Sequence, residues 1–467
     1  MKQYYLAVDI GASSGRHILG CLDNGTITLE EIYRFENGLK KVDNELCWDI
    51  PKLFEEIKNG LKKCKEIGKI PTTMGIDTWA VDFVLLDAQG KILGNTVGYR
   101  DSRTTGMDEK VYEIIPQEEL YARTGIQKQI FNSIYQLMAV KEQHPDYLEK
   151  AETLLMIPDY FHYLLTGKAM TEYTNASTTQ LVSPQSKDWD FELIDKLGYP
   201  RKIFGEISLP GSVVGSFSKE IEEEVGFSCT VVLPATHDTG SAVLSVPAND
   251  DNYIYISSGT WSLMGLERMQ ADCSPASMQA NLTNEGGYEY RFRYLKNIMG
   301  LWMIQNVRKE LNNAYSFAEL CDMAAKETVH SHVDVNDACF LAPEHMITAI
   351  QTYCKEHNEP IPETPAQIAD CVYSSLADSY AETVKELETL TGRSYERIHI
   401  VGGGSNASYL NQLTANSTKR PVYAGPTEAT AIGNILAQML HAKEFKNVSE
   451  ARSCVFSSFG VKEFLPN

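Results

Sequence analysis

The feature that most constrains the fold of this chain is a hairpin pattern that occurs twice. The segment Tyr4–Leu19, YYLAVDIGASSGRHIL, runs from apolar residues through a turn of Gly, Ala and Ser into more apolar residues. This order predicts a strand, a tight turn and a second strand. The segment Asn252–Leu266, NYIYISSGTWSLMGL, repeats it. A chain of 467 residues is too long for one hydrophobic core, so we expect two or three domains. The repeated hairpin predicts that two of them are duplicated domains that face each other.

The first turn has the composition of a phosphate-binding loop. Backbone N–H groups of the small residues Gly11–Gly15 can approach an anion closely. Asp9, at the end of the strand, is then placed to face a metal on that phosphate, and Arg16 adds positive charge. The alternative is an ordinary hairpin with a structural Asp, since small residues are common in hairpin turns. The second hairpin lacks the acid and the Arg, so the two turns would act differently on one ligand.

The charge of the chain excludes some classes of partner. The formal net charge is −20, which argues against non-specific binding of nucleic acid or of an anionic membrane. A bound nucleotide must therefore be neutralised locally, by backbone amides, Mg²⁺ and a few basic side chains. No run of about 18 apolar residues predicts a transmembrane helix. The first residues lead straight into a strand without a signal peptide, so we expect a cytoplasmic protein.

The ten cysteines are scattered, and none forms a CxxC pair. In a cytoplasmic protein we expect them to be buried thiols. Cys354 and Cys371 are close enough in sequence to be bridged, and the sequence does not decide whether they bond.

A polar interruption between two apolar stretches predicts a sugar or polyol pocket. The segment Thr73–Gly90 is predicted to form strand, interruption and strand, with Asp77, Thr78, Trp79 and Asp82 at the break. An aromatic face beside hydrogen-bond acceptors suits a sugar. The alternative interpretation is that Trp79 belongs to the core and that the acids cap a turn.

Two further stretches have less regular patterns. Residues 107–210 are predicted to be a mostly helical elaboration of the first domain, within which Thr171–Gln180, TEYTNASTTQ, is expected to be a loop. The segment Asn297–Leu311, NIMGLWMIQNVRKEL, is predicted to be an apolar helix. Its polar residues Asn297 and Gln305 are candidates to face a cleft.

The segment Leu233–Ser245, LPATHDTGSAVLS, is the strongest candidate for the chemistry. A strand is predicted to end at Leu233, and Asp238 falls at the start of a small-residue helix, Thr239–Leu244. The helix N-terminus stabilises a carboxylate there. The functional hypothesis is that Asp238 is a general base for a substrate hydroxyl, and the alternative is an ordinary helix cap.

A glycine-rich turn late in the chain is a second candidate nucleotide site. In ERIHIVGGGSNASYLNQ, a predicted strand runs into Gly402, Gly403 and Gly404 and then into a helix capped by Ser405 or Asn406. The spacing matches a dinucleotide fingerprint only weakly, and no ribose-binding acid or GK[ST] follows. We expect a turn that lets adenosine or a phosphate lie against backbone.

With these segments identified, the chain resembles the FGGY family of carbohydrate kinases over nearly its whole length. The runs that carry the resemblance are VDIGASSGR (Val8–Arg16), GIDTWAVDFVLLD (Gly75–Asp87), YRDSRT (Tyr99–Thr104), PDYF (Pro158–Phe161), EYTNAS (Glu172–Ser177), SSGTWSLMG (Ser257–Gly265), NEGG (Asn284–Gly287), LKNIMGLW (Leu295–Trp302) and IVGGGSN (Ile400–Asn406).

The resemblance implies an α/β fold of two ribonuclease-H-like domains of the actin/hexokinase/heat-shock-ATPase superfamily, with an interdomain cleft. The first domain would span residues 1–246 and hold the sugar, and the second would span residues 247–467 and hold the nucleotide. The branch of the family that it most resembles phosphorylates L-rhamnulose, which implies ATP-dependent formation of L-rhamnulose 1-phosphate in L-rhamnose catabolism. The protein would be a monomer or a dimer. The alternatives are a kinase for fuculose, xylulose or ribulose and, on the same fold, an ATP-driven switch.

The resemblance also assigns residues. Asp238 would accept the proton of the sugar hydroxyl, and Asp9 would act on Mg²⁺ through water. The residues implied to contact the sugar are Ala80, His237, Asp238, Thr239 and Asn297. Those implied to contact ATP are Ala12, Ser13, Ser14, Gly15, Arg16, Thr260, Gln305 and Gly403. One departure is visible, because the pattern TWGVD of the branch that acts on L-rhamnulose has Gly where this chain has Ala80.

Overall fold

A computed structural model describes residues 2–467, which divide into two compact units. Unit 1 comprises Met1–Ser245, Glu267–Tyr294 and Thr430–Cys454. Unit 2 comprises Val246–Leu266, Leu295–Ala429 and Val455–Asn467. Neither unit is continuous in sequence, because segments of the two units alternate along the chain after Ser245. The predicted division between residues 246 and 247 stays a prediction.

Unit 1 contains a six-stranded sheet in the order β13-β14-β6-β1-β2-β3. Its strands are β1 (Tyr5–Ile10), β2 (Ser14–Asp23), β3 (Thr26–Glu36), β6 (Thr73–Thr78), β13 (Val213–Ser216) and β14 (Thr230–Val232). Strands β1, β6 and β14 are parallel, and β2 pairs antiparallel with β1 and with β3. The first predicted hairpin is thereby confirmed as β1 and β2.

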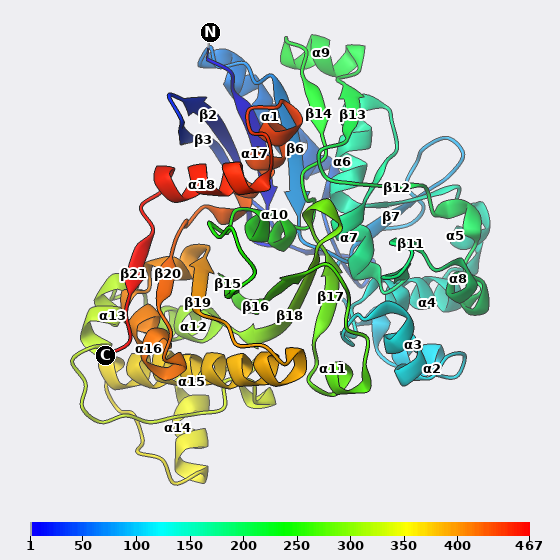
Figure 1. The fold of residues 1–467 in the computed structure, drawn as a ribbon. Helices are drawn as coiled ribbons and strands as arrows, with labels where there is room; N and C mark the ends of the chain where they lie inside the picture. Colours follow the sequence, from blue (N-terminus) through cyan, green and yellow to red (C-terminus); the bar gives the residue numbers. More distant parts are fainter. Residues whose placement is uncertain (1) are drawn as a thin grey trace. The chain divides into compact units, whose positions relative to one another are not determined.

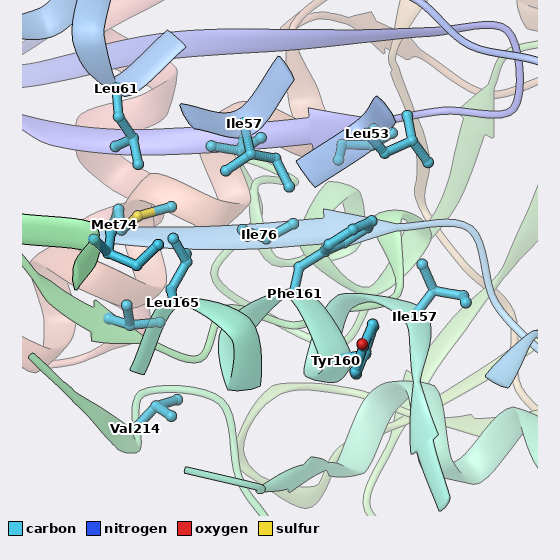
Figure 2. Close-up of a cluster of buried hydrophobic side chains, with 14 of the residues drawn as sticks. Leu53, Ile57, Leu61, Met74, Ile76, Ile157, Tyr160, Phe161, Leu165 and Val214 are labelled. Atoms are coloured by element: carbon cyan, nitrogen blue, oxygen red, sulfur yellow. The ribbon is translucent and has the colours of Figure 1, made fainter. Parts of the chain in front are cut away.

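Helices cover both faces of this sheet, as the alternation of its side chains requires. On one face, Leu53 and Ile57 of α1 (Ile50–Glu66) point toward Ile76 of β6, and Phe161 of α6 (Ile157–Thr166) packs beside them (Figure 2). On the other face lies α17 (Ala429–His441), whose Ile435 would meet a Cβ added at Gly20 of β2.

The remaining elements of unit 1 lie between and beside these. They are β4 (Lys40–Val42), β5 (Glu45–Cys47), β7 (Phe83–Leu86), α2 (Met107–Tyr112), α3 (Gln117–Thr124), α4 (Ser133–Gln143), α5 (Pro145–Lys150), β8 (Thr153–Met156), β9 (Thr171–Glu172), α7 (Tyr173–Ala176), β10 (Val182–Ser183), β11 (Asp188–Trp189), α8 (Phe191–Leu197), β12 (Ile207–Ser208), α9 (Lys219–Val225), α10 (Asp238–Leu244), α11 (Pro275–Gln279), β17 (Thr283–Gly286) and most of α18 (Val448–Ser458).

The sheet of unit 2 carries β18, β16, β15, β19, β20 and β21 in that order. Its strands are β15 (Tyr253–Ser258), β16 (Trp261–Arg268), β18 (Phe292–Met299), β19 (Arg397–Val401), β20 (Val422–Ala424) and β21 (Lys462–Phe464). Strands β15, β19 and β20 are parallel, whereas β16 and β21 pair antiparallel with their neighbours β15 and β20. Read in reverse, this order places β20, β19, β15, β16 and β18 at the positions that β14, β6, β1, β2 and β3 occupy in unit 1, which fits a duplicated domain. The edge strands differ, because β21 follows β20 in the chain whereas β13 precedes β14.

The helices of unit 2 are α12 (Trp302–Glu310), α13 (Phe317–Ala324), α14 (Met346–Glu356), α15 (Pro365–Thr391) and α16 (Ser408–Thr418). Helix α15, the long gold helix of Figure 1, begins where Thr364 and Gln367 form a capping box and ends at Gly392 in the left-handed conformation. A 27-residue helix with these caps and a buried stripe agrees with the pattern of its sequence.

Three local predictions are wrong. Thr171–Gln180 is not an open loop but a buried succession of β9, α7 and a 3₁₀ turn. Asn297 lies on strand β18 rather than in a helix, which begins only at Trp302. Because Gly300 has no Cβ, the chain after β18 can lie directly against the backbone of Trp261 and Ser262. Helix α16 starts at Ser408, after a 3₁₀ turn that takes in both predicted caps.

The cysteines agree with the prediction of buried thiols for most positions. Cys354 and Cys371 are both buried and both free, so they form no disulfide. Cys339 is exposed and Cys273 is half-buried, which departs from the prediction. No helix among residues 2–467 is long and apolar enough to cross a membrane.

Candidate active site

The parallel strands of unit 1 bring three carboxylates to one edge of the sheet. Asp9 of β1 and Asp77 of β6 are paired in the strand register and lie on the same face, near the carboxyl ends of their strands. The chain beyond β14 continues alongside β6, because Thr78 forms a bridge with His237. Asp238 follows at once as the first residue of α10. Ligand sites of α/β sheets are built at such carboxyl ends.

The turn between β1 and β2 has the form expected of an anion-binding loop. It is closed by a hydrogen bond from the Gly11 N–H to the Ser14 carbonyl, 2.8 Å. Asn37 supports it from outside, donating from its side chain to the Gly11 carbonyl at 2.8 Å. No acceptor within the described chain takes the N–H groups of Ala12 or Ser13. These two amides are available to an anion, as a phosphate requires.

Arg16 and Asp9 flank this turn as an ion pair. The Arg16 guanidinium donates to Asp9 Oδ2 at 2.6 Å, and the two side chains are 20% and 11% exposed. The pair is close enough to solvent to be opened by a ligand. Among residues 2–467 no group of three or more His, Cys, Asp and Glu is arranged to hold a metal. A single carboxylate fits Mg²⁺ that arrives on a phosphate and keeps most of its waters.

Asp77 is the innermost of the three carboxylates. Its side chain is fully buried, and Oδ2 accepts a hydrogen bond from Asn434 Nδ2 of α17 at 2.6 Å. Burial, and then the negative charge of Asp9, raise the pKa of Asp77 well above its ordinary range. Burial thus disfavours the charged form of Asp77, and the hydrogen bond from Asn434 makes this residue a structural partner of α17.

Asp238 is more accessible, with 35% of its side chain exposed. Its Oδ1 accepts from the backbone N–H of Thr239 at 2.6 Å and from the Thr239 hydroxyl at 3.2 Å, which fixes the orientation of the carboxylate. Desolvation by the surrounding protein raises the pKa of Asp238, and the charge of Asp9 adds to this rise, while His237 opposes it. A raised pKa on an oriented, reachable carboxylate is what a general base needs.

Glu172 holds the segment that leads into α10. It is fully buried, and its Oε2 accepts from the backbone N–H of Thr236 at 3.1 Å and from the Thr236 hydroxyl at 2.7 Å. Its Oε1 accepts from the Thr174 N–H at 2.8 Å. The sequence interpretation missed this role, although Glu172 opens the EYTNAS run, because a run of hydroxyl side chains also suits an exposed loop.

The residues of the polar interruption after β6 are mostly buried, and their side chains contact one another within the core. Trp79 is 7% exposed and Asp82 is 1% exposed. The Asp82 carboxylate accepts from Trp48 Nε1 at 2.6 Å and from Trp79 Nε1 at 3.0 Å. The alternative interpretation of Trp79 as a core residue therefore holds.

Ala80 is presented by a strained turn. The Asp82 N–H donates to the Ala80 carbonyl at 2.9 Å, which closes a three-residue γ-turn around Val81. Val81 has φ +65°, which a β-branched residue adopts only under constraint. Ser133 Oγ supplies that constraint by donating to the Val81 carbonyl at 2.5 Å. The half-buried Ala80 is thus held in a defined position beside α4.

In unit 2, the predicted nucleotide residues gather at the turn between β15 and β16. Thr260 Oγ1 donates to Gln305 Oε1 of α12 at 3.5 Å, and the Thr260 carbonyl accepts from the Trp302 N–H at 3.1 Å. The glycines after β19 lie against the same turn, since a Cβ added at Gly404 would be 1.9 Å from Ser258 Oγ. A Cβ added at Gly403 would meet no atom within 4 Å.

Asn297 is half-buried on β18 in unit 2, and its Oδ1 has no hydrogen-bond partner among residues 2–467. A shielded amide oxygen without a partner is costly, so this atom is a candidate to accept a hydrogen bond from a ligand.

Comparison with known proteins identifies the family. Residues 4–245 match the N-terminal domain of the FGGY family of carbohydrate kinases, and residues 254–442 match its C-terminal domain. The chain belongs to the FGGY family of carbohydrate kinases. The family resemblance predicted from the sequence motifs is confirmed, as is the two-domain α/β fold.

Curated relatives within the family match almost end to end. A rhamnulokinase of Halalkalibacterium halodurans is 53% identical over 99% of this chain and 98% of its own length. A rhamnulokinase of Oceanobacillus iheyensis is 50% identical over 99% of this chain and 98% of its own length. Among solved structures, gluconate kinase from Lactobacillus acidophilus superposes with a TM-score of 0.82 at 16% identity, covering 100% of this chain and 94% of its own. The last similarity supports the fold alone.

Proposed function

We propose that this FGGY kinase transfers the γ-phosphoryl group of ATP to the 1-hydroxyl of L-rhamnulose, forming L-rhamnulose 1-phosphate and ADP. The observation that carries the choice of sugar is the near full-length similarity to rhamnulokinases of two organisms. The proposed role is in L-rhamnose catabolism in the cytoplasm. The protein is proposed to be a monomer or a dimer.

Asp238 acts as the proton acceptor in this proposal. The 1-hydroxyl oxygen attacks the γ-phosphorus, a new O–P bond forms, and the bond from the γ-phosphorus to the β,γ-bridging oxygen breaks. The hydroxyl proton passes to Asp238, and ADP leaves with the bridging oxygen. Support comes from the oriented, partly exposed carboxylate at the start of α10 and from the rise in the pKa of Asp238.

The phosphates of ATP are assigned to the first turn. The backbone amides of Ala12 and Ser13, with Ser14, Gly15 and Arg16, bind them, and Asp9 holds Mg²⁺ through water. When bound, Mg²⁺ supplies positive charge to the phosphate oxygens. The two amides without an internal acceptor and the ion pair beside them support this assignment.

The rest of the nucleotide is assigned to Thr260, Gln305 and Gly403. Support comes from their gathering around one turn of unit 2, where Gly403 faces open space.

The sugar is assigned to Ala80, His237, Thr239 and Asn297, in addition to Asp238. The γ-turn that holds Ala80 and the unpartnered Oδ1 of Asn297 support this part of the proposal. The Ala80 methyl group, where the rhamnulokinase pattern has Gly, would narrow the pocket or alter the preference among ketoses.

A coupled assay of ADP release tests the function. L-rhamnulose, L-fuculose, L-xylulose and L-ribulose are supplied separately with ATP and Mg²⁺, and the phosphorylated product is analysed by NMR. We expect the highest kcat/KM with L-rhamnulose and phosphate at carbon 1. Higher kcat/KM with another ketose would overturn the choice of sugar. ADP release that is independent of any ketose would overturn the kinase assignment.

A further inference from the structure

Arg293 is the largest fully buried side chain of unit 1. It contacts His237, the residue before Asp238 in the candidate active site. It lies at the start of β18 with 0% exposure. Its Nε donates to the Gly286 carbonyl at 2.8 Å, and its NH1 group is 3.0 Å from Glu285 Oε2. Its NH2 group is 3.0 Å from His237 Nδ1. Three contacts on three nitrogens fix the plane of the guanidinium group.

The contact with His237 has only one possible direction. A guanidinium group has five N–H donors and no acceptor. Arg293 therefore donates, and His237 Nδ1 must accept with its lone pair. A neutral imidazole with an accepting Nδ1 carries its proton on Nε2. That nitrogen faces the Asp238 carboxylate, with Nε2 3.4 Å from Oδ1.

We propose that Arg293 is a positioning residue that holds His237 in the neutral tautomer with the proton on Nε2. His237 then presents a donor to the sugar and to Asp238, and Asp238 is the only base of the pair. The last step rests on the proposed function, whereas the tautomer follows from the contacts of the resting protein.

The charges around the ring support the neutral form. A second proton on Nδ1 would point at the Arg293 NH2 group, 3.0 Å away. Glu285 Oε2 lies 3.4 Å from Nδ1 and could accept a hydrogen bond from a protonated Nδ1. The negative charge of Glu285, however, is already balanced by Arg293. Burial raises the pKa of Glu285, but its interactions with Arg293 and His237 together lower that pKa.

Loss of the donor at residue 293 would change this balance. Without the guanidinium group, Nδ1 regains the freedom to take a proton and to donate to residue 285. His237 would then populate the other tautomer or the imidazolium form. An imidazolium 3.4 Å from Asp238 would stabilise the carboxylate and make it a weaker base.

NMR of histidine side chains in the full-length protein tests the tautomer directly. The protein is labelled with ¹⁵N-histidine, and the His237 signals are assigned by their loss in His237→Gln. At pH 7.5 we expect a proton on Nε2 and a bare Nδ1 in the wild type. The same pattern should persist in Arg293→Lys, because lysine also only donates. In Arg293→Met combined with Glu285→Gln, we expect the pattern to be lost.

The matched control is Arg123→Met. Arg123 is a half-buried arginine of unit 1 with a carboxylate partner, Asp190 at 2.8 Å. Its loss should lower stability while leaving the His237 signals unchanged. In activity, the acid limb of kcat/KM should move by about one pH unit in the Arg293→Met/Glu285→Gln variant and not in the control.

A wild-type spectrum with a protonated Nδ1 would overturn the proposal, whatever the variants do. So would an unchanged Nε2–H pattern in the folded Arg293→Met/Glu285→Gln variant. If that variant does not fold, loss of the pattern in Arg293→Lys would overturn the proposal, and its retention there together with the wild-type spectrum supports it. Because the spectra need no turnover, they stand even if no ketose proves to be a substrate.

Discussion

Asn434 of α17 donates a hydrogen bond to Asp77 of β6 over 2.6 Å, and neither side chain has measurable exposure. The two residues are 357 positions apart in the chain. The side-chain oxygen of Asn434 accepts a hydrogen bond from Gln438 Nε2 at 2.7 Å. The side-chain oxygen of Gln438 accepts in turn from the Thr73 hydroxyl at 2.7 Å. This buried ladder fastens a helix from the end of the chain to the strand edge where the three carboxylates meet.

The ladder predicts a large effect of Asn434→Ala on stability. The substitution leaves Asp77 Oδ2 buried without its donor, so we expect a loss of about 1–3 kcal/mol in the free energy of unfolding. Thermal and urea unfolding of both proteins measure it. Asn95→Ala, at an exposed amide that donates to Glu45, should change stability much less. Equal losses in the two variants would contradict the importance of the ladder.

Asp238→Asn should abolish most turnover. A positioned general base contributes about 10²–10⁴ in rate, so we expect kcat to fall by at least about two orders of magnitude. The KM for ATP should change little, because Asp238 is assigned to the sugar. The control is Asp195→Asn, which removes a half-exposed carboxylate that forms an ion pair with Arg201. Near-normal turnover of Asp238→Asn would remove this residue from the mechanism.

Gly433→Ala should separate α17 from α10. A Cβ at this position would lie 1.7 Å from the Ser241 carbonyl oxygen, which is backbone and cannot rotate away. Overpacking of this kind costs about 1–3 kcal/mol, and because α10 carries Asp238, kcat should fall as well. Gly38→Ala is a suitable comparison, since a Cβ there meets nothing within 4 Å. The free energy of unfolding and kcat are measured for both variants. A loss in Gly433→Ala alone would show that the contact with Ser241 is the cause, whereas equal losses in both variants would contradict this.

His162 makes stability depend on pH. Burial lowers its pKa to about 3, and its Nε2 accepts from the Ile76 N–H at 3.0 Å. In the unfolded chain the same histidine titrates near about 6.5. The unfolded state therefore binds a proton that the folded state refuses, so stability is present above about pH 6.5 and is lost as pH falls toward about 3.

His162→Gln, whose amide oxygen can take over the acceptor role, should weaken this pH dependence. The test compares the melting temperatures of wild type and variant at pH 7.5, 6.0 and 5.0. The wild type should lose more stability on acidification than the variant. Parallel curves would show that His162 is not a source of the acid sensitivity; His17, whose pKa burial lowers to about 4, would remain as the alternative source.

Gly403→Ala separates a structural glycine from a ligand contact. The added Cβ would meet no protein atom within 4 Å, so the melting temperature should stay within about 2 °C of the wild type. If Gly403 lies against the nucleotide, the KM for ATP should rise severalfold while the KM for the sugar stays constant. Gly460→Ala, equally unobstructed in unit 2, should change neither. An unchanged KM for ATP would remove Gly403 from the nucleotide site.

The local order of residues was sufficient to predict much of the fold. Both hairpins follow from turn composition and from the apolar residues on either side of each turn. These signals depend on residues a few positions apart, so they can be recognised in the sequence without knowledge of the tertiary structure. The same holds for Asp238 at the start of α10.

Only the tertiary structure could decide which distant polar groups meet. Arg293 and His237 are 56 positions apart, and nothing in the local sequence marks the arginine as a partner of the site. The segment Thr171–Gln180 looks like a loop by composition, yet its hydroxyl groups are buried against Glu172 and α10. A buried polar group is stable only where packing supplies its partner. That partner is chosen by the arrangement of strands and helices, which joins residues that the sequence keeps apart.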